Sequence, residues 1–306
     1  MSSLSSLASR RPSSLLPVLA LTLNALVWGT SWWPFRRLES FGWHPLWTTA
    51  VVFALASAVI VTWRPRALGQ VLRNPALWVL LLAAGTTNAA FNWAVVIGDV
   101  VRVVLLFYLM PLWTVLLARL LLKERLSGSA ALRIALGLAG AVIVLWPEGG
   151  SGPGAWPVPH SLADWLGVLG GFSFALNNVM LRREAAQPEE ARAFAMFVGG
   201  AFVALVLATV LSSSDPSTRP TTPTLPALGL LLGLAGVFLV SNFALQYGAA
   251  RLPANLTAVV MLTEVVFAAA SSLAFGDGVL SLQLVLGGAL ILAGAALAAT
   301  GPGAAH

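Results

Sequence analysis

Long apolar segments alternate with short polar connections along the whole chain. Runs of about 18 to 25 apolar residues are long enough to cross a bilayer as helices. The sequence contains ten such runs, near residues 14–34, 44–63, 76–98, 100–122, 129–147, 161–181, 192–212, 225–248, 252–275 and 279–300. Only Gly98 and Asp99 separate the third from the fourth, so we expect a tight turn there. The expected fold class is an all-α membrane protein with ten transmembrane helices.

Basic residues are distributed unevenly between the two sides that these spans define. Of the 17 Lys and Arg residues, four lie on the side opposite the N-terminus, namely Arg36, Arg37, Arg102 and Arg219. Cytoplasmic loops of membrane proteins are enriched in Lys and Arg. The pattern therefore predicts a multi-pass protein of the inner (plasma) membrane with both termini in the cytoplasm. It also accounts for the net charge of +6 without any binding of nucleic acid.

Composition narrows the function classes further. The chain is 58% hydrophobic and 9% charged, with a mean hydropathy of +0.87, which leaves too little polar surface for a soluble protein. It contains no cysteine, so disulfides and thiolate metal sites are excluded. The three histidines, His44, His160 and His306, lie in loops or at the terminus, and we find no metal-binding or nucleotide-binding motif. We expect no enzyme activity, no metal and no cofactor.

The two halves of the chain resemble each other. The third span contains Asn-Trp-Ala followed by a glycine (92–98), and the eighth contains Asn-Phe-Ala followed by a glycine (242–248), at a constant offset of 150 residues. We therefore expect one membrane domain built from two five-helix repeats, residues 1–150 and 151–306. Because five is odd, the second repeat must enter the bilayer from the opposite face. Inverted repeats of this kind are typical of transporters whose substrate site lies near the midplane, although a duplicated chain could also serve as an inert scaffold.

Two short motifs carry a resemblance to a known family. The run FYLMPLWTVLLARLLLKERL at 107–126, followed by the glycine-bearing fifth span, resembles the fourth-helix signature of the drug/metabolite transporter superfamily. Its EamA-type, ten-helix branch is the closest match, and the segment 24–30 with its Trp-Gly step resembles that branch as well. The resemblance implies a basket of helices around a central cavity, lined by spans 1, 3, 4, 6, 8 and 9, with spans 5 and 10 at the periphery. It also implies export of amino acids or similar metabolites. Where the ninth helix of the family often repeats the proline of the fourth, this chain has Glu264.

Polar side chains inside the spans are candidates for the cavity lining, because lipid offers them no hydrogen-bond partner. Seven amides lie within the first, third, sixth and eighth spans: Asn24, Asn88, Asn92, Asn177, Asn178, Asn242 and Gln246. Several recur at intervals of four residues and so share a helix face. Each amide could contact substrate, or could join two helices through a hydrogen bond of roughly 0.6 to 2 kcal/mol. The sequence leaves both roles open.

Glu264 is the most informative single residue of the sequence. A carboxylate near the centre of a span costs on the order of 3 kcal/mol to insert, so it needs a reason to be there. It could carry a coupling proton as the cavity alternates between the two sides, or receive the ammonium group of a substrate. The structural alternative is a hydrogen bond to a neighbouring Asn or Thr such as Thr257.

Proline and aromatic residues complete the set of candidates. Pro111 should kink the fourth span, because it lacks an N–H and clashes with the carbonyl group of Phe107. Tyr108 supplies aromatic surface beside it. Trp28, Trp32 and Trp93 lie deep in their spans beside the amides, where they would form an aromatic cavity wall or simply pack in the core.

Taken together, these features predict a secondary transporter. We expect it to export amino acids, aromatic or apolar ones in particular, or related small metabolites from the cytoplasm by alternating access. The expected partners are a small-molecule substrate, the lipid bilayer and, as candidate coupling ion, a proton; a monomer and a homodimer both stay open. The alternatives are a drug or amine efflux carrier of the same fold, a membrane scaffold or sensor without transport activity, and a lipid-modifying enzyme or flippase, for which paired catalytic groups are missing from the spans.

Overall fold

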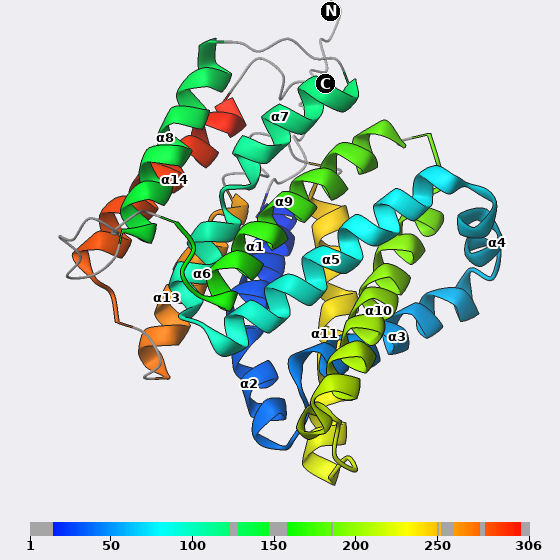
Figure 1. Cartoon of the computed structure of the whole chain (residues 1–306). Coiled ribbons are helices and arrows are strands. Elements are labelled where there is room, and N and C mark those ends of the chain that lie inside the picture. Colours follow the sequence, from blue (N-terminus) through cyan, green and yellow to red (C-terminus); the bar gives the residue numbers. More distant parts are fainter. Residues whose placement is uncertain are drawn as a thin grey trace, which may run out of the picture.

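The computed structural model describes residues 15–122, 128–146, 158–184, 186–249, 251, 260–275 and 279–300, and this part of the chain is helical with no strand (Figure 1). In chain order the helices are α1 (Leu15–Thr30), α2 (Trp32–Ser40), α3 (Pro45–Trp63), α4 (Arg66–Arg73), α5 (Pro75–Ile97), α6 (Val100–Phe107), α7 (Met110–Leu122), α8 (Gly128–Leu145), α9 (Leu162–Arg183), α10 (Glu189–Ser214), the 3-10 turn η1 (Pro216–Thr218), α11 (Leu225–Ala249), α13 (Thr263–Ala274) and α14 (Leu282–Thr300). These helices overlap each of the ten apolar segments read from the sequence. The segment 252–259, which belongs to the expected ninth span, lies outside the described residues.

Six helical stretches of the described chain are long and apolar enough to cross a membrane: Leu15–Ser40, Pro45–Trp63, Pro75–Ile97, Val100–Leu121, Glu189–Ser214 and Leu225–Leu245. Shorter apolar helices occur at Ile134–Leu145, Thr263–Ala274 and Leu282–Gly294. Large apolar side chains also point outward from the bundle, for example Leu120 at 73% and Val210 at 59% exposure. Such surfaces suit lipid, and the chain is a multi-pass membrane protein.

Short polar signals set where the helices begin. Pro75 starts α5, and the side chain of Asn74 accepts a hydrogen bond from the backbone N–H of Ala76. The tight turn expected between the third and fourth spans is confirmed, since α5 ends at Ile97 and α6 begins at Val100. Asp99 caps α6 by accepting a hydrogen bond from the N–H of Arg102 at 2.7 Å.

Two spans contain a break in the helix. The first divides into α1 and α2 around Ser31, and the fourth divides into α6 and α7 at Tyr108 and Leu109. The expected distortion near Pro111 is therefore confirmed, but it takes the form of an interruption. The backbone of Pro111 lies in the first turn of α7, where a missing N–H leaves no helical hydrogen bond unmade.

The helices pack in pairs that cross closely. α5 lies between α9 and α10, α3 packs on α10, and α1 packs on both α11 and α13. α8 and α14 pack on each other at one side of the bundle, and α4 lies at the opposite edge (Figure 1). Where α5 meets α10, a Cβ on Gly199 would lie 2.1 Å from the carbonyl oxygen of Leu81. Glycine is thus required for this contact, as is common between membrane helices.

Candidate functional site

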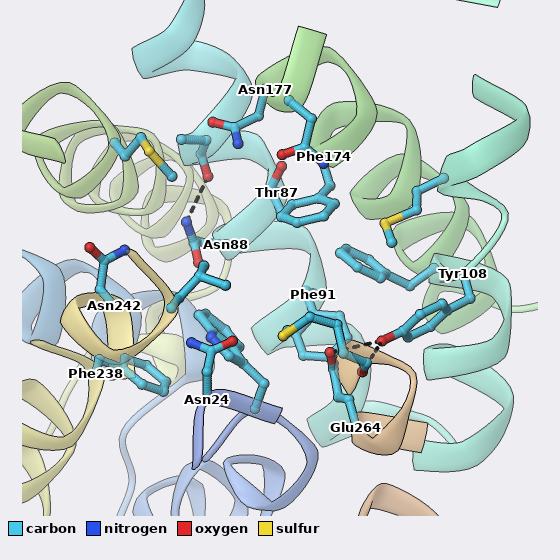
Figure 2. Close-up of a pocket in the computed structure, with 18 of the residues that line it drawn as sticks. Asn24, Thr87, Asn88, Phe91, Tyr108, Phe174, Asn177, Phe238, Asn242 and Glu264 are labelled. Carbon is cyan, nitrogen blue, oxygen red and sulfur yellow. Dashed lines mark hydrogen bonds between the residues drawn. The ribbon is translucent and has the colours of Figure 1, made fainter. Parts of the chain in front are cut away.

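A cavity of about 510 Å³ lies among the helices. Its lining comes from α1, α3, α5, the α6–α7 junction, α9, α10, α11 and α13 (Figure 2). None of its described lining residues comes from α8 or α14, the fifth and tenth spans, which agrees with the arrangement that the resemblance implied. α3 and α10 contribute in addition, through Phe53, Met196 and Phe197.

Glu264 and Tyr108 face each other at one side of the cavity (Figure 2). Glu264 is 7% exposed and Tyr108 2%. The phenol oxygen of Tyr108 lies 3.1 Å from Oε2 of Glu264 and 3.0 Å from the carbonyl oxygen of Met261. A phenol has one hydrogen to donate, so it can serve one of these two acceptors fully at a time. A protonated Glu264 can donate to the phenol oxygen itself, which frees the phenol hydrogen for Met261.

Close packing of α1 on α13 fixes the backbone at Glu264. A Cβ on Gly29 of α1 would lie 2.7 Å from the carbonyl oxygen of Glu264, so α1 contacts α13 directly beside this residue. Two turns further along α13, the hydroxyl of Ser271 donates to the carbonyl oxygen of Gly29 at 3.2 Å. The expected alternative partner, Thr257, lies outside the described residues.

The amides of the cavity combine a structural contact with an open acceptor. Nδ2 of Asn24 donates to the carbonyl oxygen of Ser241 at 3.0 Å and to its Oγ at 2.7 Å, which ties α1 to α11. Because a carbonyl can only accept, this bond fixes the side chain with Oδ1 on the other side. Oδ1 of Asn24 and Oδ1 of Asn177 are both buried without a hydrogen-bond partner in the described structure. Asn88 uses its Nδ2 in a bond of 2.8 Å to the carbonyl oxygen of Ala84.

Aromatic rings form a continuous wall across the cavity. Trp28 stacks on Phe238 with ring centroids 4.8 Å apart and an interplanar angle of 14°. From Trp28 the contacts continue edge-on to Phe91 at 6.1 Å, and from Phe91 to Phe107 at 5.0 Å. Phe107 in turn lies 5.3 Å from Phe174. Rings from α11, α1, α5, α6 and α9 are thus joined in one series.

A second pocket of about 550 Å³ adjoins the cavity between α3, α10 and α11. It shares Phe197 and Asn242 with the first. Its charged lining residues are Arg64, Glu189 and Glu190. Carboxylates therefore outnumber cations among the described residues of this pocket.

Comparison with known proteins identifies the family. The model of the EamA-like transporter family matches residues 15–146 and again 161–300. The chain belongs to this family. This membership in a family of transporters confirms the resemblance read from the sequence.

Two individual relatives were compared with the chain, one by sequence and one by structure. An "Uncharacterized transporter" of Helicobacter pylori (strain ATCC 700392 / 26695) is 28% identical over 184 residues, which cover 60% of this chain and 59% of the relative. The match thus spans less than two thirds of the relative. A solved structure titled "Crystal structure of protein" shares 19% identity at a TM-score of 0.58, covering 92% of this chain and 96% of that one. This likeness establishes the overall fold of the EamA chain.

Most of the candidate residues read from the sequence meet in this one cavity. The described lining contains Asn24, Trp28, Asn88, Tyr108, Asn177, Asn178, Asn242 and Glu264. Pro111 and Gln246 belong to α7 and α11 by their backbones, but their side chains lie outside the described part of the structure.

Three expected lining residues are placed elsewhere, between helices. Asn92 donates from Nδ2 to Oγ1 of Thr49 at 3.1 Å and so joins α5 to α3. Trp32 donates from Nε1 to Oγ of Ser271 at 2.9 Å, between α2 and α13. Asn92 and Trp32 lie one turn beyond the lining residues Asn88 and Trp28, and at that level each side chain meets a neighbouring helix instead of the cavity.

Trp93 is the third residue that lies outside the cavity. It packs edge-on against the imidazole of His44, with ring centroids 5.2 Å apart. Burial lowers the pKa of His44, which favours the neutral ring. The neutral Nδ1 accepts a hydrogen bond from the N–H of Leu46 and caps α3. Trp93 therefore packs against the residue that caps the start of α3.

The phenylalanines of the wall are not among the residues predicted from the sequence. An apolar ring has no polar group that needs a partner and can face lipid, another helix or a cavity, so residue type alone gives no signal. Spacing does give one. In each of four helices an aromatic residue lies three or four positions from a lining amide: Asn24 and Trp28 in α1, Asn88 and Phe91 in α5, Phe174 and Asn177 in α9, Phe238 and Asn242 in α11. Such neighbours share a helix face, and the amides could have pointed to the rings.

Proposed function

We propose that this chain is a secondary transporter of the inner membrane that exports small metabolites, amino acids or amines among them, from the cytoplasm by alternating access. The observation that carries the proposal is the mid-bundle cavity of about 510 Å³ with the carboxyl group of Glu264 inside it. A cavity of this size suits a small organic molecule. A buried ionisable group at such a place is by default functional.

Helix packing supports a division into two inverted repeats, residues 1–150 and 151–306. The test is to replace each of the ten spans by its counterpart in the other repeat, so that the first becomes the sixth and the sixth becomes the first. Under this exchange the observed helix contacts are mapped onto one another. The contact of α1 with α11 becomes that of α9 with α5, and the contact of α1 with α13 becomes that of α9 with α6 and α7. The pairs α3–α10 and α8–α14 are each exchanged within themselves. The two separate matches of the family model agree with this division.

The second pocket supports an opening to the cytoplasm. With both termini inside, as the distribution of Lys and Arg favours, the end of α3, the start of α10 and the second half of α11 face the cytoplasm. These segments supply Arg64, Glu189 and Phe243 to the pocket. Substrate would therefore enter the cavity between α3, α10 and α11.

Contacts at the opposite face support a closed outer side. Arg102 of α6 forms a bidentate ion pair with Asp164 of α9, with Nε–Oδ1 and Nη2–Oδ2 distances of 2.7 and 3.0 Å. Trp32 and Ser271 join α2 to α13 on the same side. Alternating access requires these two outer contacts to separate while the cytoplasmic entrance closes.

Glu264 is the proposed site of proton coupling. A proton taken up from one side neutralises the carboxylate, and Tyr108 can adjust its single hydrogen to either state. Release on the other side completes the cycle, so that the proton gradient drives export.

Flux through reconstituted proteoliposomes tests the proposal. Purified protein is placed in vesicles with an imposed pH gradient, and a panel of labelled amino acids, amines and metabolites is offered. We expect protein-dependent flux of at least one compound that collapses when the gradient is dissipated. A membrane scaffold or sensor predicts no flux of any compound, and that outcome would reject the transporter.

A further inference from the structure

We infer that the cargo is a lipophilic amine, with a cationic ammonium group, an apolar or aromatic body and no carboxylate. The inference rests on the proposed transport function and narrows its substrate class. It separates amines from amino acids, which carry the same ammonium group together with a carboxylate.

The first step is the charge of the cavity. Among its described lining residues, Glu264 carries the one carboxyl group, and no Lys, Arg or His is present. The segment 252–259 that connects α11 to α13 contains no basic residue in its sequence either. A charge removed from water must be paired with an opposite charge or with several hydrogen-bond donors. An ammonium group finds Glu264, whereas a substrate carboxylate finds no cation.

The second step is the direction of the amide groups. Nδ2 of Asn24 is already used by Ser241, and Nδ2 of Asn88 by the carbonyl oxygen of Ala84. Among the lining amides of the described structure, the buried atoms without a hydrogen-bond partner are instead the Oδ1 oxygens of Asn24 and Asn177. Buried acceptors without a donor make the surroundings of the cavity electrically negative, which suits an ammonium group and repels a carboxylate.

The third step is the aromatic wall. Trp28, Phe91, Phe174 and Phe238 each lie one turn from a lining amide, and their rings belong to the continuous series described above. In the alternating order of the spans, α1 and α5 run opposite to α9 and α11. The ring follows the amide in the first pair of helices and precedes it in the second, so all four rings fall on the same side of the amides. The cavity then has an apolar aromatic layer beside an acceptor layer, which matches an amine with an aromatic body.

The adjoining pocket has the same charge preference. Glu189, Glu190 and Arg64 are the charged residues of its described lining, which therefore favours an approaching cation over an anion. Both spaces along the proposed entry route thus select against a carboxylate.

Matched ligands test the inference on the unmodified protein. Thermal stabilisation and proteoliposome uptake are measured with 2-phenylethylamine and phenylalanine, which differ by a carboxylate, and with tryptamine and tryptophan. The methyl ester of phenylalanine serves as a third probe, since it keeps the approximate size and the ammonium group of the amino acid but lacks the negative charge of the carboxylate. We expect both amines and the ester to act at concentrations at least roughly tenfold lower than the amino acids.

The outcomes separate this inference from the proposed function. If phenylalanine binds or is transported as well as phenylethylamine, the amine class is wrong and transport stands. If another metabolite of the wider panel is transported but no amine is, the amine class is again wrong and transport stands. If no compound moves under any gradient, both proposals fail.

A variant pair identifies the group that recognises the ammonium. 2-Phenylethanol is a neutral analogue of phenylethylamine, and the wild-type protein should prefer the amine at least roughly tenfold. Glu264→Gln should remove that preference. Asp215→Asn is the matched control, because Asp215 is an exposed carboxylate in the loop before η1 and should leave the preference unchanged. An unchanged preference in Glu264→Gln would contradict the assignment; if that variant does not fold, the ligand series on the unmodified protein still decides the inference.

Discussion

The phenol oxygen of Tyr108 lies 3.1 Å from Oε2 of Glu264 and 3.0 Å from the carbonyl oxygen of Met261. Tyr108 belongs to the junction of α6 and α7, and Met261 precedes α13. The single phenol hydrogen of Tyr108 is thus shared between the carboxyl group of Glu264 and the backbone carbonyl group of Met261. The protonation state of Glu264 decides which of the two the phenol serves.

Tyr108→Phe tests this relationship. The ring stays in the cavity wall, but Glu264 and the Met261 carbonyl lose their donor. We expect the maximal rate of proton-driven transport to fall roughly tenfold, since a hydrogen bond to a charged group contributes about 1.5 to 3 kcal/mol. The pH profile of transport should change as well. A rate and a pH profile equal to those of the wild type would show that the hydroxyl has no part in coupling.

Glu264→Gln tests the coupling proton directly. The amide can still accept from Tyr108 but cannot release a proton in the cycle. We expect transport driven by a pH gradient to be abolished, while substrate exchange across the vesicle membrane remains measurable at raised substrate concentration. Asp215→Asn provides the control with an exposed carboxylate. Unchanged pH-driven flux would refute the role of Glu264.

Gly199→Ala tests the close crossing of α5 and α10. The new Cβ would lie 2.1 Å from the carbonyl oxygen of Leu81, so the helices must separate. We expect a loss of about 1 to 3 kcal/mol in the free energy of unfolding, seen as a lower melting temperature in detergent. In Gly229→Ala, where nothing lies within 4 Å of the new atom, the change should stay within about 0.5 kcal/mol. Equal melting temperatures for the two variants would contradict the crossing.

Asn92 and Thr49 allow the two roles of a membrane amide to be separated. Their hydrogen bond of 3.1 Å joins α5 to α3 outside the cavity. Asn92→Ala should lower stability by about 0.6 to 2 kcal/mol and leave the KM for substrate unchanged. Adding Thr49→Val should cost little more, because the shared bond is already lost. A raised KM with normal stability would return Asn92 to the binding site.

The ion pair of Arg102 and Asp164 offers a test of the outer contact. Asp164→Asn keeps the oxygen that accepts the N–H of His160 and removes the charge that holds Arg102. We expect the cavity to open more often to the outside. The chain has no cysteine, so a single cysteine at Phe174 reports access without further substitutions. Labelling by an impermeant thiol reagent from outside should be several times faster than in Asp215→Asn.

The sequence indicated the spans and the polar part of the cavity better than its apolar part. Glu264 and the amides Asn24 and Asn177 could be recognised, because a polar group inside a span needs a partner or a cavity. The rings of Phe107 and Phe238 could not, because an apolar ring has no polar group that needs a partner and occurs at lipid-facing, packed and cavity positions alike. For Trp32 the sequence left cavity wall and core packing open, since depth in a span does not fix which neighbour a side chain meets.

The break in the fourth span shows a similar limit. Pro111 indicated that the helix is disturbed, because its missing N–H is a local property of the chain. Whether the helix bends or restarts depends on its neighbours. Here Phe107 and Tyr108 pack against α9 and α13, and the helix ends there.

The helix pair α8–α14 takes no part in the described lining, yet it is tied to the start of α6. Arg102 donates to the carbonyl oxygen of Val144, and Gln283 of α14 donates to the carbonyl oxygens of Ile143 and Trp146. A Cβ on Gly140 would lie 2.5 Å from the carbonyl oxygen of Gly287, so the pair is closely joined. We therefore expect the pair to stay fixed during transport, with α6 attached to it. Spin labels on α8 and α14 should keep the same separation throughout a transport cycle, whereas the separation between labels on α6 and α9 should change.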